Sequence, residues 1–353
     1  MGGGGAGGAG GATTSTASSA SGSSSVATSS TSSGEGGCDA DLTTSPDHCG
    51  ACFHACDGLC EDAKCQPVVL VSALSEPRGI AVDDDHVYWV NHAGATIGGG
   101  DVRRVNKDGT EPTVLAGMQT GPWDLELSEG YLYWTNRAGD SIGRVKADGS
   151  EAPSLIATGV LGPTDLVVGD QVYFVASTQG TIFAVDKAGA ADPVPLVVGL
   201  QNPEAITLGG NELFFTDATT GDVHRVPVTG GAASLFYDAA AAPAFQIAVT
   251  PSGAVWCAFG EAAIRYQAFG STTSSVIGDG TECWGVFTEG ERVYWTQEFY
   301  GGGPVGTVMS ADSDGAALVE HATAQVGPTG IATDAAAIYW TSFIGGQVFR
   351  VNK

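Results

Sequence analysis

The stretch from Gly121 to Gly149 decides the fold and reads GPWDLELSEGYLYWTNRAGDSIGRVKADG. An opening proline is followed by an apolar run, an aromatic tetrapeptide, a Gly-Arg-Val segment and an Asp-Gly turn. Each short run is rich in β-branched or aromatic residues and is bounded by Gly, Pro or Asp, which is typical of β-strands. We predict four strands in this repeat, at 124–127, 132–136, 142–146 and 154–157.

The same pattern recurs along the rest of the chain. Its tetrapeptides begin at Tyr88, Tyr133, Tyr173, Phe214, Val255, Tyr294 and Tyr339. A period of roughly 40 residues is typical of propellers and solenoids. No window shows a sustained apolar period of 3.6 residues, so we predict no long helix.

Asp-Gly pairs mark the hairpins between strands. Asp108-Gly109 and Asp148-Gly149 each separate two predicted strands. Because Gly adopts positive φ without a steric cost, these pairs predict two-residue primed turns.

The two ends of the repeat region predict how the ring closes. The last copy stops at Lys353 after its third strand, whereas residues 68–73 resemble a fourth strand that no repeat precedes. Pairing these fragments completes one blade and removes the open edges of the array. We therefore predict an all-β fold, a seven-bladed β-propeller of four-stranded blades over residues 66–353, closed by the N-terminal strand.

Several tetrapeptides resemble those of the YWTD-type propellers of the low-density-lipoprotein-receptor kind. The matching copies are Tyr88–Asn91, Tyr133–Asn136, Phe214–Asp217, Tyr294–Gln297 and Tyr339–Ser342. Residues 104–109 and 144–149 also look like the Arg-x-x-x-Asp-Gly hairpins of that family. The resemblance implies a β-propeller whose Tyr-Trp pairs pack between blades and which binds a partner. The family rings have six blades, whereas this chain has seven copies.

The segment before the propeller has a different composition. Residues 1–37 are almost entirely Gly, Ser, Thr and Ala, which predicts a low-complexity disordered tether. No signal peptide and no apolar membrane-spanning run is present in the sequence. Our hypothesis is that an export signal lies upstream of the printed start. In one form of this hypothesis it is a lipoprotein signal, which would give the protein a lipid anchor. This layout resembles bacterial exported or surface-anchored propeller proteins, and we expect a periplasmic, cell-surface or extracellular location.

Cysteines support an oxidising compartment. Six lie in residues 38–65, namely Cys38, Cys49, Cys52, Cys56, Cys60 and Cys65. Such density in a segment with little else to form a core predicts disulfides, and six cysteines permit fifteen pairings. The alternative is a metal site at Cys49-x-x-Cys52 with His48 and His54.

Cys257 and Cys283 form a separate pair within the repeats. Cys257 takes the third position of its tetrapeptide, and Cys283 replaces the proline that opens the next inner strand. We predict a disulfide between neighbouring blades, with two buried free thiols as the alternative.

Charge narrows the class of partner. The 353-residue chain carries 39 acidic and 14 basic residues and a net charge of −25. This balance disfavours nucleic acid and anionic membranes, which require basic patches. We expect an acidic protein, monomeric, with a protein, peptide or glycan partner.

Alignment of the copies predicts a ring of residues at one mouth of the central channel. The aligned pairs are Arg78-Gly79, Trp123-Asp124, Thr164-Asp165, Glu204-Ala205, Phe245-Gln246, Trp284-Gly285 and Thr329-Gly330. Glycine-rich loops at 91–101 and 297–306 are expected to flank this mouth. The candidate ligand-binding residues are Arg78, Trp123, Asp124, Asp165, Glu204, Gln246 and Trp284, with Glu298, Phe299 and Tyr300 projecting near Trp284.

Exposed aromatics beside carboxylates suit a sugar or a peptide, because apolar faces stack while polar groups fix orientation. Alternatively, the tryptophans only plug the channel and the acids are solvated. The sequence has no nucleophile elbow, no metalloprotease helix and no phosphate-binding loop, so we assign no catalytic residue.

The main prediction is therefore a non-enzymatic exported binding propeller without a cofactor. One alternative is a metal-dependent hydrolase or lyase, similar to propeller lactonases, in which Asp124, Asp165 and Glu204 hold Ca²⁺ or Mg²⁺. Another is a structural surface protein.

Overall fold

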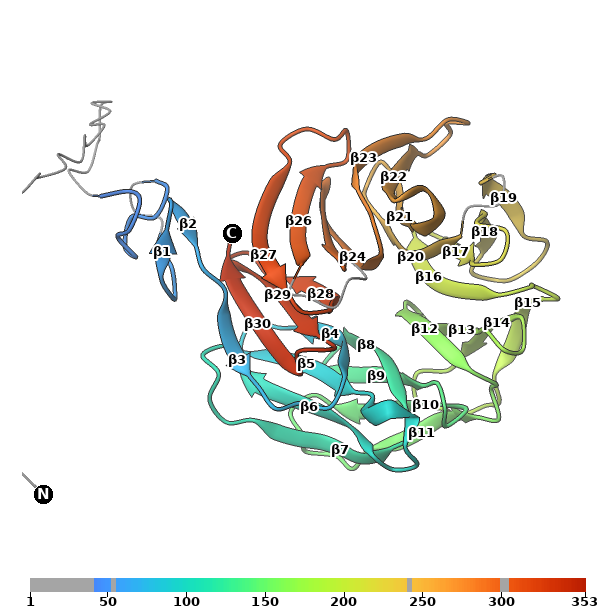
Figure 1. Cartoon of the computed structure of the whole chain (residues 1–353). Coiled ribbons are helices and arrows are strands. Elements are labelled where there is room, and N and C mark those ends of the chain that lie inside the picture. Colours follow the sequence, from blue (N-terminus) through green and yellow to red (C-terminus); the bar gives the residue numbers. More distant parts are fainter. Residues whose placement is uncertain (1–40, 52–54, 240–242, 299–304) are drawn as a thin grey trace, which may run out of the picture.

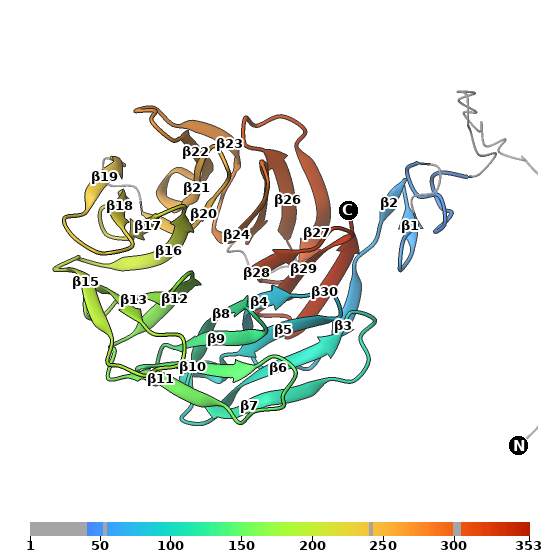
Figure 2. The same cartoon turned by 180° about the vertical axis from the view of Figure 1, so that it is seen from behind.

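Seven sheets of four antiparallel strands form a ring in the computed structural model, which describes residues 41–51, 55–239, 243–298 and 305–353. Figure 1 shows the blades around a central axis, and Figure 2 shows the same ring from behind. The predicted seven-bladed β-propeller is confirmed. Residues 1–40, which include the whole predicted tether, lie outside the described residues.

Each blade runs from an inner strand at the channel to an outer strand at the rim. Blade one contains β4 (Pro77–Val82), β5 (His86–Asn91), β6 (Gly100–Asn106) and β7 (Thr113–Gln119). Blade two contains β8 (Pro122–Ser128), β9 (Tyr131–Asn136), β10 (Ser141–Lys146) and β11 (Ser154–Thr158). Blade three contains β12 (Pro163–Val168), β13 (Val172–Ala176), β14 (Thr181–Val185) and β15 (Val194–Val198). Blade four contains β16 (Pro203–Gly209), β17 (Glu212–Asp217), β18 (Val223–Pro227) and β19 (Ser234–Tyr237).

The remaining blades repeat this order. Blade five contains β20 (Ala244–Val249), β21 (Gly253–Ala258), β22 (Ala263–Ala268) and β23 (Ser275–Asp279). Blade six contains β24 (Cys283–Glu289), β25 (Arg292–Gln297), β26 (Gly306–Asp312) and β27 (Val319–Gln325). Blade seven contains β28 (Pro328–Thr333), β29 (Ala337–Ser342), β30 (Gln347–Asn352) and β3 (Val68–Val71). The helices of the described chain are two single 3₁₀ turns, η1 (Ala93–Ala95) and η2 (Phe259–Glu261).

The N-terminal strand closes the ring. Strand β3 pairs antiparallel with β30, with Val69 opposite Phe349. In Figure 1 the blue β3 accordingly lies beside the red β30. The predicted closure is therefore confirmed, and neither end of the array exposes an unpaired inner edge.

The Asp-Gly hairpins differ from the predicted primed turns. The Gly109 N–H donates to the Asn106 carbonyl at 2.8 Å, and Gly109 has φ +83°, whereas Asp108 is not among the residues with positive φ. The Asp108 carboxylate instead accepts the Thr110 N–H at 2.8 Å. Because this side-chain bond holds Asp108 in an ordinary turn conformation, only Gly takes the left-handed position of a three-residue loop.

The aromatic tetrapeptides form the second strand of each blade and pack between blades, as predicted. Five of their tryptophans are fully buried: Trp89, Trp134, Trp256, Trp295 and Trp340. Large aromatic side chains contribute most to burial in such a core.

The third residue of the tetrapeptide joins neighbouring blades. The Thr341 hydroxyl accepts the Gly330 N–H of its own blade at 2.9 Å and donates to the Arg78 carbonyl of the next blade at 2.8 Å. Thr135, Thr216 and Thr296 donate in the same way to the carbonyls of Thr164, Phe245 and Thr329. These threonines fix the backbone at the first residues of the inner strands, where the channel opens.

A disulfide replaces this threonine in blade five. Cys257 of β21 is bonded to Cys283 of β24, and both residues are fully buried. The predicted bridge between neighbouring blades is confirmed, and it fixes the start of the inner strand that carries Trp284.

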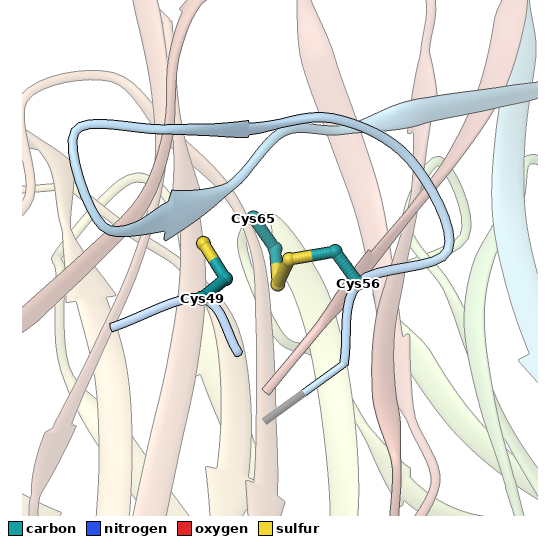
Figure 3. Close-up of side chains that lie close together, drawn as sticks. All are labelled: Cys49, Cys56 and Cys65. Atoms are coloured by element: carbon teal, nitrogen blue, oxygen red, sulfur yellow. A yellow bond between two sulfur atoms is a disulfide. The ribbon is translucent and has the colours of Figure 1, made fainter. Parts of the chain in front are cut away.

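The cysteine-rich segment forms a small hairpin of β1 (Cys60–Glu61) and β2 (Lys64–Cys65). Its described disulfides are Cys49–Cys60 and Cys56–Cys65. The sulfur atoms of Cys49, Cys56 and Cys65 lie within 4.8 Å of one another, and Figure 3 shows this group. Because all three are oxidised, they do not offer the thiolates that a metal requires. Cys38, Cys52 and His54 lie outside the described residues.

The residues just before this hairpin contact β30 of blade seven. Arg350 forms an ion pair with Asp57 at 2.6 Å, and Asn352 donates to the Ala55 carbonyl at 3.2 Å. Within the described chain, no helix has the length and apolarity needed to span a membrane.

Candidate functional site

The central channel encloses a cavity of about 470 Å³ that is lined by all seven inner strands. This volume falls in the range of small-ligand sites. Its lining includes seven of the predicted candidates: Arg78, Trp123, Asp124, Asp165, Glu204, Gln246 and Trp284. The structure thus brings them together, and their role in binding stays a prediction.

Two rings of residues surround the mouth of this channel. We call first ring the residues Arg78, Trp123, Thr164, Glu204, Phe245, Trp284 and Thr329, one from the start of each inner strand. We call second ring the residues that directly follow the tetrapeptides: His92, Arg137, Ser177, Ala218, Phe259, Glu298 and Phe343.

One backbone contact places the second ring in every blade. The N–H of each second-ring residue donates to the carbonyl that lies two residues before the first-ring residue of the same blade, for example from Arg137 to Gly121 at 2.9 Å and from Phe343 to Gly327 at 2.7 Å. The second ring therefore lies beside the first at the same mouth. Of its members, our sequence analysis named only Glu298.

A cationic cluster occupies the mouth at blades seven, one and two. The Arg78 guanidinium lies 3.5 Å from the ring centre of Trp123 and 4.1 Å from that of Phe343. The Arg137 guanidinium lies 4.2 Å from the same Trp123 ring, and His92 meets this ring edge-on at 5.1 Å. Guanidinium groups stack favourably on aromatic faces.

Neither of these guanidiniums has a hydrogen bond or an ion pair with a residue that the structure describes, and the Nε of Arg78 is buried without an acceptor. Burial, together with the charge of Arg137, lowers the pKa of Arg78 to about 10. The group therefore stays protonated at neutral pH.

Carboxylates face this cluster at longer range. Burial raises the pKa of Glu204, and the charges of Arg137 and Arg78 partly offset this rise. Burial also raises the pKa of Glu298, and Glu282 adds to the shift. The mouth consequently contains both signs of charge without a direct ion pair at Arg78 or Arg137 among the described residues.

An aromatic cluster occupies the mouth at blades five and six. Trp284 lies 6.0 Å from Phe245 and 5.8 Å from Phe259, and the two phenylalanine rings meet at 5.1 Å. The Nε1 of Trp284 is buried without an acceptor. This cluster offers an apolar surface with one unused donor.

Asp124 and Asp165 join inner strands deeper in the channel. The Leu166 N–H donates to Asp165 at 2.8 Å and to Asp124 at 3.3 Å, and the Ile206 N–H donates to Asp165 at 2.9 Å. Burial raises the pKa of both carboxyls, and the charge of Asp124 raises that of Asp165 well above its usual range. Two carboxyls this close favour protonation of one of them, and their backbone bonds link blades two, three and four.

These carboxyls do not converge with Glu204 on one point. Among the residues that the structure describes, the only group of three ligand atoms within 4.8 Å is the oxidised cysteine group. The oxygens of Asp124 and Asp165 also accept hydrogen bonds from backbone N–H groups, and the two carboxyls interact with each other. Ca²⁺ and Mg²⁺ take several oxygen ligands at once, and the described carboxylates of the channel do not form a group of three.

The predicted loop residues are placed only in part. The Glu298 N–H donates to the Glu282 carbonyl at 3.2 Å, and the Glu298 carboxylate interacts electrostatically with Arg78. Phe299 and Tyr300 lie outside the described residues. Arg137, Phe259 and Phe343 were missed, although their shared position after the tetrapeptide was a usable signal.

Solved propeller structures are similar to most of this chain. Virginiamycin B lyase from Staphylococcus aureus has a TM-score of 0.68 and 18% identity, over 82% of this chain and 98% of that chain. A streptogramin B lyase has a TM-score of 0.66 and 16% identity, over 81% and 97%. The computationally designed Ika8 protein has a TM-score of 0.58 and 12% identity, over 81% and 98%.

At these identities the similarity shows the fold alone. The chain is a seven-bladed β-propeller with disulfide bonds. Its sequence matches no family model and no curated protein. Membership of the YWTD-type family stays a prediction.

Proposed function

We propose that this protein is a non-enzymatic propeller that binds a ligand at the channel mouth. The observation that carries the proposal is the pairing of two clusters at the entrance to one cavity: the cationic cluster around Trp123 and the aromatic cluster around Trp284. Both contain buried donors without acceptors, at Arg78 and Trp284. A ligand with an apolar face and acceptor atoms would satisfy both, and a peptide or a glycan has these features.

The buried disulfides support export as part of this proposal, because such bonds persist in oxidising compartments. A lipid anchor and membership of the YWTD-type family are further parts that stay open to test. The anchor would be tested by mass spectrometry of the protein from its native host.

The direct test is calorimetric titration of the oxidised full chain with a panel of neutral glycans and short peptides. We expect at least one class to bind and Trp284→Ala to abolish that binding while the melting temperature stays close to wild type. Tyr131→Ala is the matched control, because Tyr131 contacts Glu151 and Arg144 away from the mouth. Equal loss in both variants would contradict a site at Trp284.

A second candidate is an acid–base enzyme, and one observation favours it. Asp124 and Asp165 line the cavity, and burial raises the pKa of both carboxyls, which suits a pair that donates and accepts protons near neutral pH. The metal-dependent hydrolase or lyase with Ca²⁺ or Mg²⁺ belongs to this class. It predicts that a chelator lowers the melting temperature and that Asp165→Asn removes this effect. A structural surface protein predicts no ligand and no effect of either change.

A further inference from the structure

We infer that the channel mouth recognises the free carboxylate at the C-terminus of a peptide, with Arg78 and Arg137 as its binding groups. This inference rests on the proposed function and names the chemical group that the site selects.

Four arginines of the described chain form no ion pair with a described carboxylate: Arg78, Arg104, Arg137 and Arg144. Of these, Arg104 donates to the Ala147 carbonyl and Arg144 lies over the Tyr131 ring, whereas Arg78 and Arg137 lie together on Trp123. Carboxylates outnumber basic residues in this chain, with 39 against 14. Five other arginines form an ion pair with one of them: Arg103, Arg225, Arg265, Arg292 and Arg350. Arg78 and Arg137 instead lie on one Trp123 ring, without an ion pair to any described carboxylate and close enough that the charge of Arg137 lowers the pKa of Arg78. Two neighbouring guanidiniums without a direct ion pair to a described carboxylate leave their donors available to an anionic ligand.

The available hydrogen-bonding atoms favour a carboxylate. Arginine presents a planar fork of donors that matches the two oxygens of a carboxylate. Within the described chain, the Nε of Arg78 is a buried donor without an acceptor, and a carboxylate supplies acceptors only. The carboxylates of Glu76, Glu204 and Glu298 act on Arg78 at longer range. They would repel a doubly charged phosphate more strongly than a singly charged carboxylate.

The position of the site favours a chain end. The cavity lies on the axis of the ring and all seven inner strands enclose it, so a polymer enters it end-on. At a peptide C-terminus, the carboxylate and the last side chain lie on the same residue. The carboxylate would bind the cationic cluster, and an apolar last side chain would contact the rings of Phe245, Phe259 and Trp284.

The test compares N-acetyl-Gly-Gly-Phe with its C-terminal amide, titrated calorimetrically into the oxidised full chain at neutral pH. We expect the free acid to bind at least about ten-fold more tightly than the amide, because the amide lacks the charged acceptor. Arg78→Gln and Arg137→Gln should each weaken binding of the acid by about ten-fold and leave the amide within about two-fold. Arg225→Gln, which removes a rim arginine paired with Glu212 at 3.3 Å, is the control and should change neither.

Each other outcome overturns the inference in a recognisable way. Equal affinity for acid and amide would exclude carboxylate recognition and leave the proposed ligand site intact. Binding of a glucuronate-terminated disaccharide without binding of the peptide would assign the site to acidic glycans. If no peptide or glycan binds, both the inference and the proposed function fail. If the arginine variants do not fold, the comparison of acid and amide on the wild-type protein decides alone.

Discussion

Removing the disulfide between blades five and six should weaken the whole propeller, because that bond replaces the inter-blade hydrogen bond of the other tetrapeptides. We consider the variant Cys257→Ala/Cys283→Ala. The two sulfur atoms are fully buried and link β21 to β24. Four other blades use a threonine hydroxyl at the position of Cys257. Blade five therefore loses its only bridge of this type when the cysteines are replaced.

The magnitude follows from the length of chain that the bond closes. The two cysteines are separated by 26 residues. The chain-entropy model for a loop of this length predicts a loss of about 3.5 kcal/mol in the free energy of unfolding at 25 °C. A Cys257→Thr/Cys283→Ala variant should recover about 1 kcal/mol of this loss, because a threonine at 257 can donate to the Trp284 carbonyl as Thr216 does to Phe245.

Urea denaturation of the oxidised full chain, followed by tryptophan fluorescence, measures these differences. The control is Cys49→Ala/Cys60→Ala, which removes a disulfide of the N-terminal hairpin and should leave the propeller transition in place. The reasoning is refuted if the double alanine variant loses less than about 1 kcal/mol. It is also refuted if threonine at 257 is no better than alanine.

Three further changes test the core and the channel. Thr341→Val should cost about 1–3 kcal/mol in urea denaturation, because the half-buried Gly330 N–H and Arg78 carbonyl lose their partner. An unchanged midpoint would contradict the inter-blade role. Gly143→Ala should cost about 1–3 kcal/mol or more, because its Cβ would lie 2.1 Å from the Trp134 ring. The control Gly117→Ala should be tolerated, because its Cβ would meet Val114 at 3.9 Å. Similar losses of stability in both variants would show that packing is not the cause. Burial raises the pKa of Glu126 from 4.5 to about 8, so the folded state binds the extra proton in this window and stability should fall as pH rises through it. Glu126→Gln, whose amide oxygen can still accept the Val168 N–H, should flatten this decline between about pH 5 and pH 8, and an equal slope in both proteins would exclude Glu126 as its source.

Part of the candidate site could be predicted because the repeats align. The first ring was found by counting from each tetrapeptide to the next inner strand, and its candidate members Arg78, Trp123, Glu204 and Trp284 line one cavity. The second ring follows from the same counting, since its members lie one residue after each tetrapeptide. Their residue types differ from blade to blade, however, so the sequence does not mark them as a group. Arg137 and Phe343 became visible only as neighbours of Trp123 and Arg78.

The carboxylates show the opposite limit. Their positions in the channel were predicted, but their partners were not. Asp124 and Asp165 lie 41 residues apart in sequence, and each accepts an N–H from the inner strand of a following blade. Such contacts depend on the rotation between blades, which no local pattern records. They link inner strands, whereas the sequence alone suggested a metal or a ligand as their partner.

The sequence by itself predicted the number of blades, their four-strand order, the closure by residues 68–73 and, with free thiols as the alternative, the bridge from Cys257 to Cys283. These features repeat at a fixed spacing, and each blade packs only on its neighbours, so local pattern is sufficient. The tertiary structure alone decided which side chains meet across the mouth. Arg78 and Arg137 lie on the ring of Trp123 without an ion pair to a described residue. The Asp165 carboxylate of an inner strand accepts the backbone N–H of Ile206. The physical reason is that these contacts join different blades, where distance and burial are set by the closed ring.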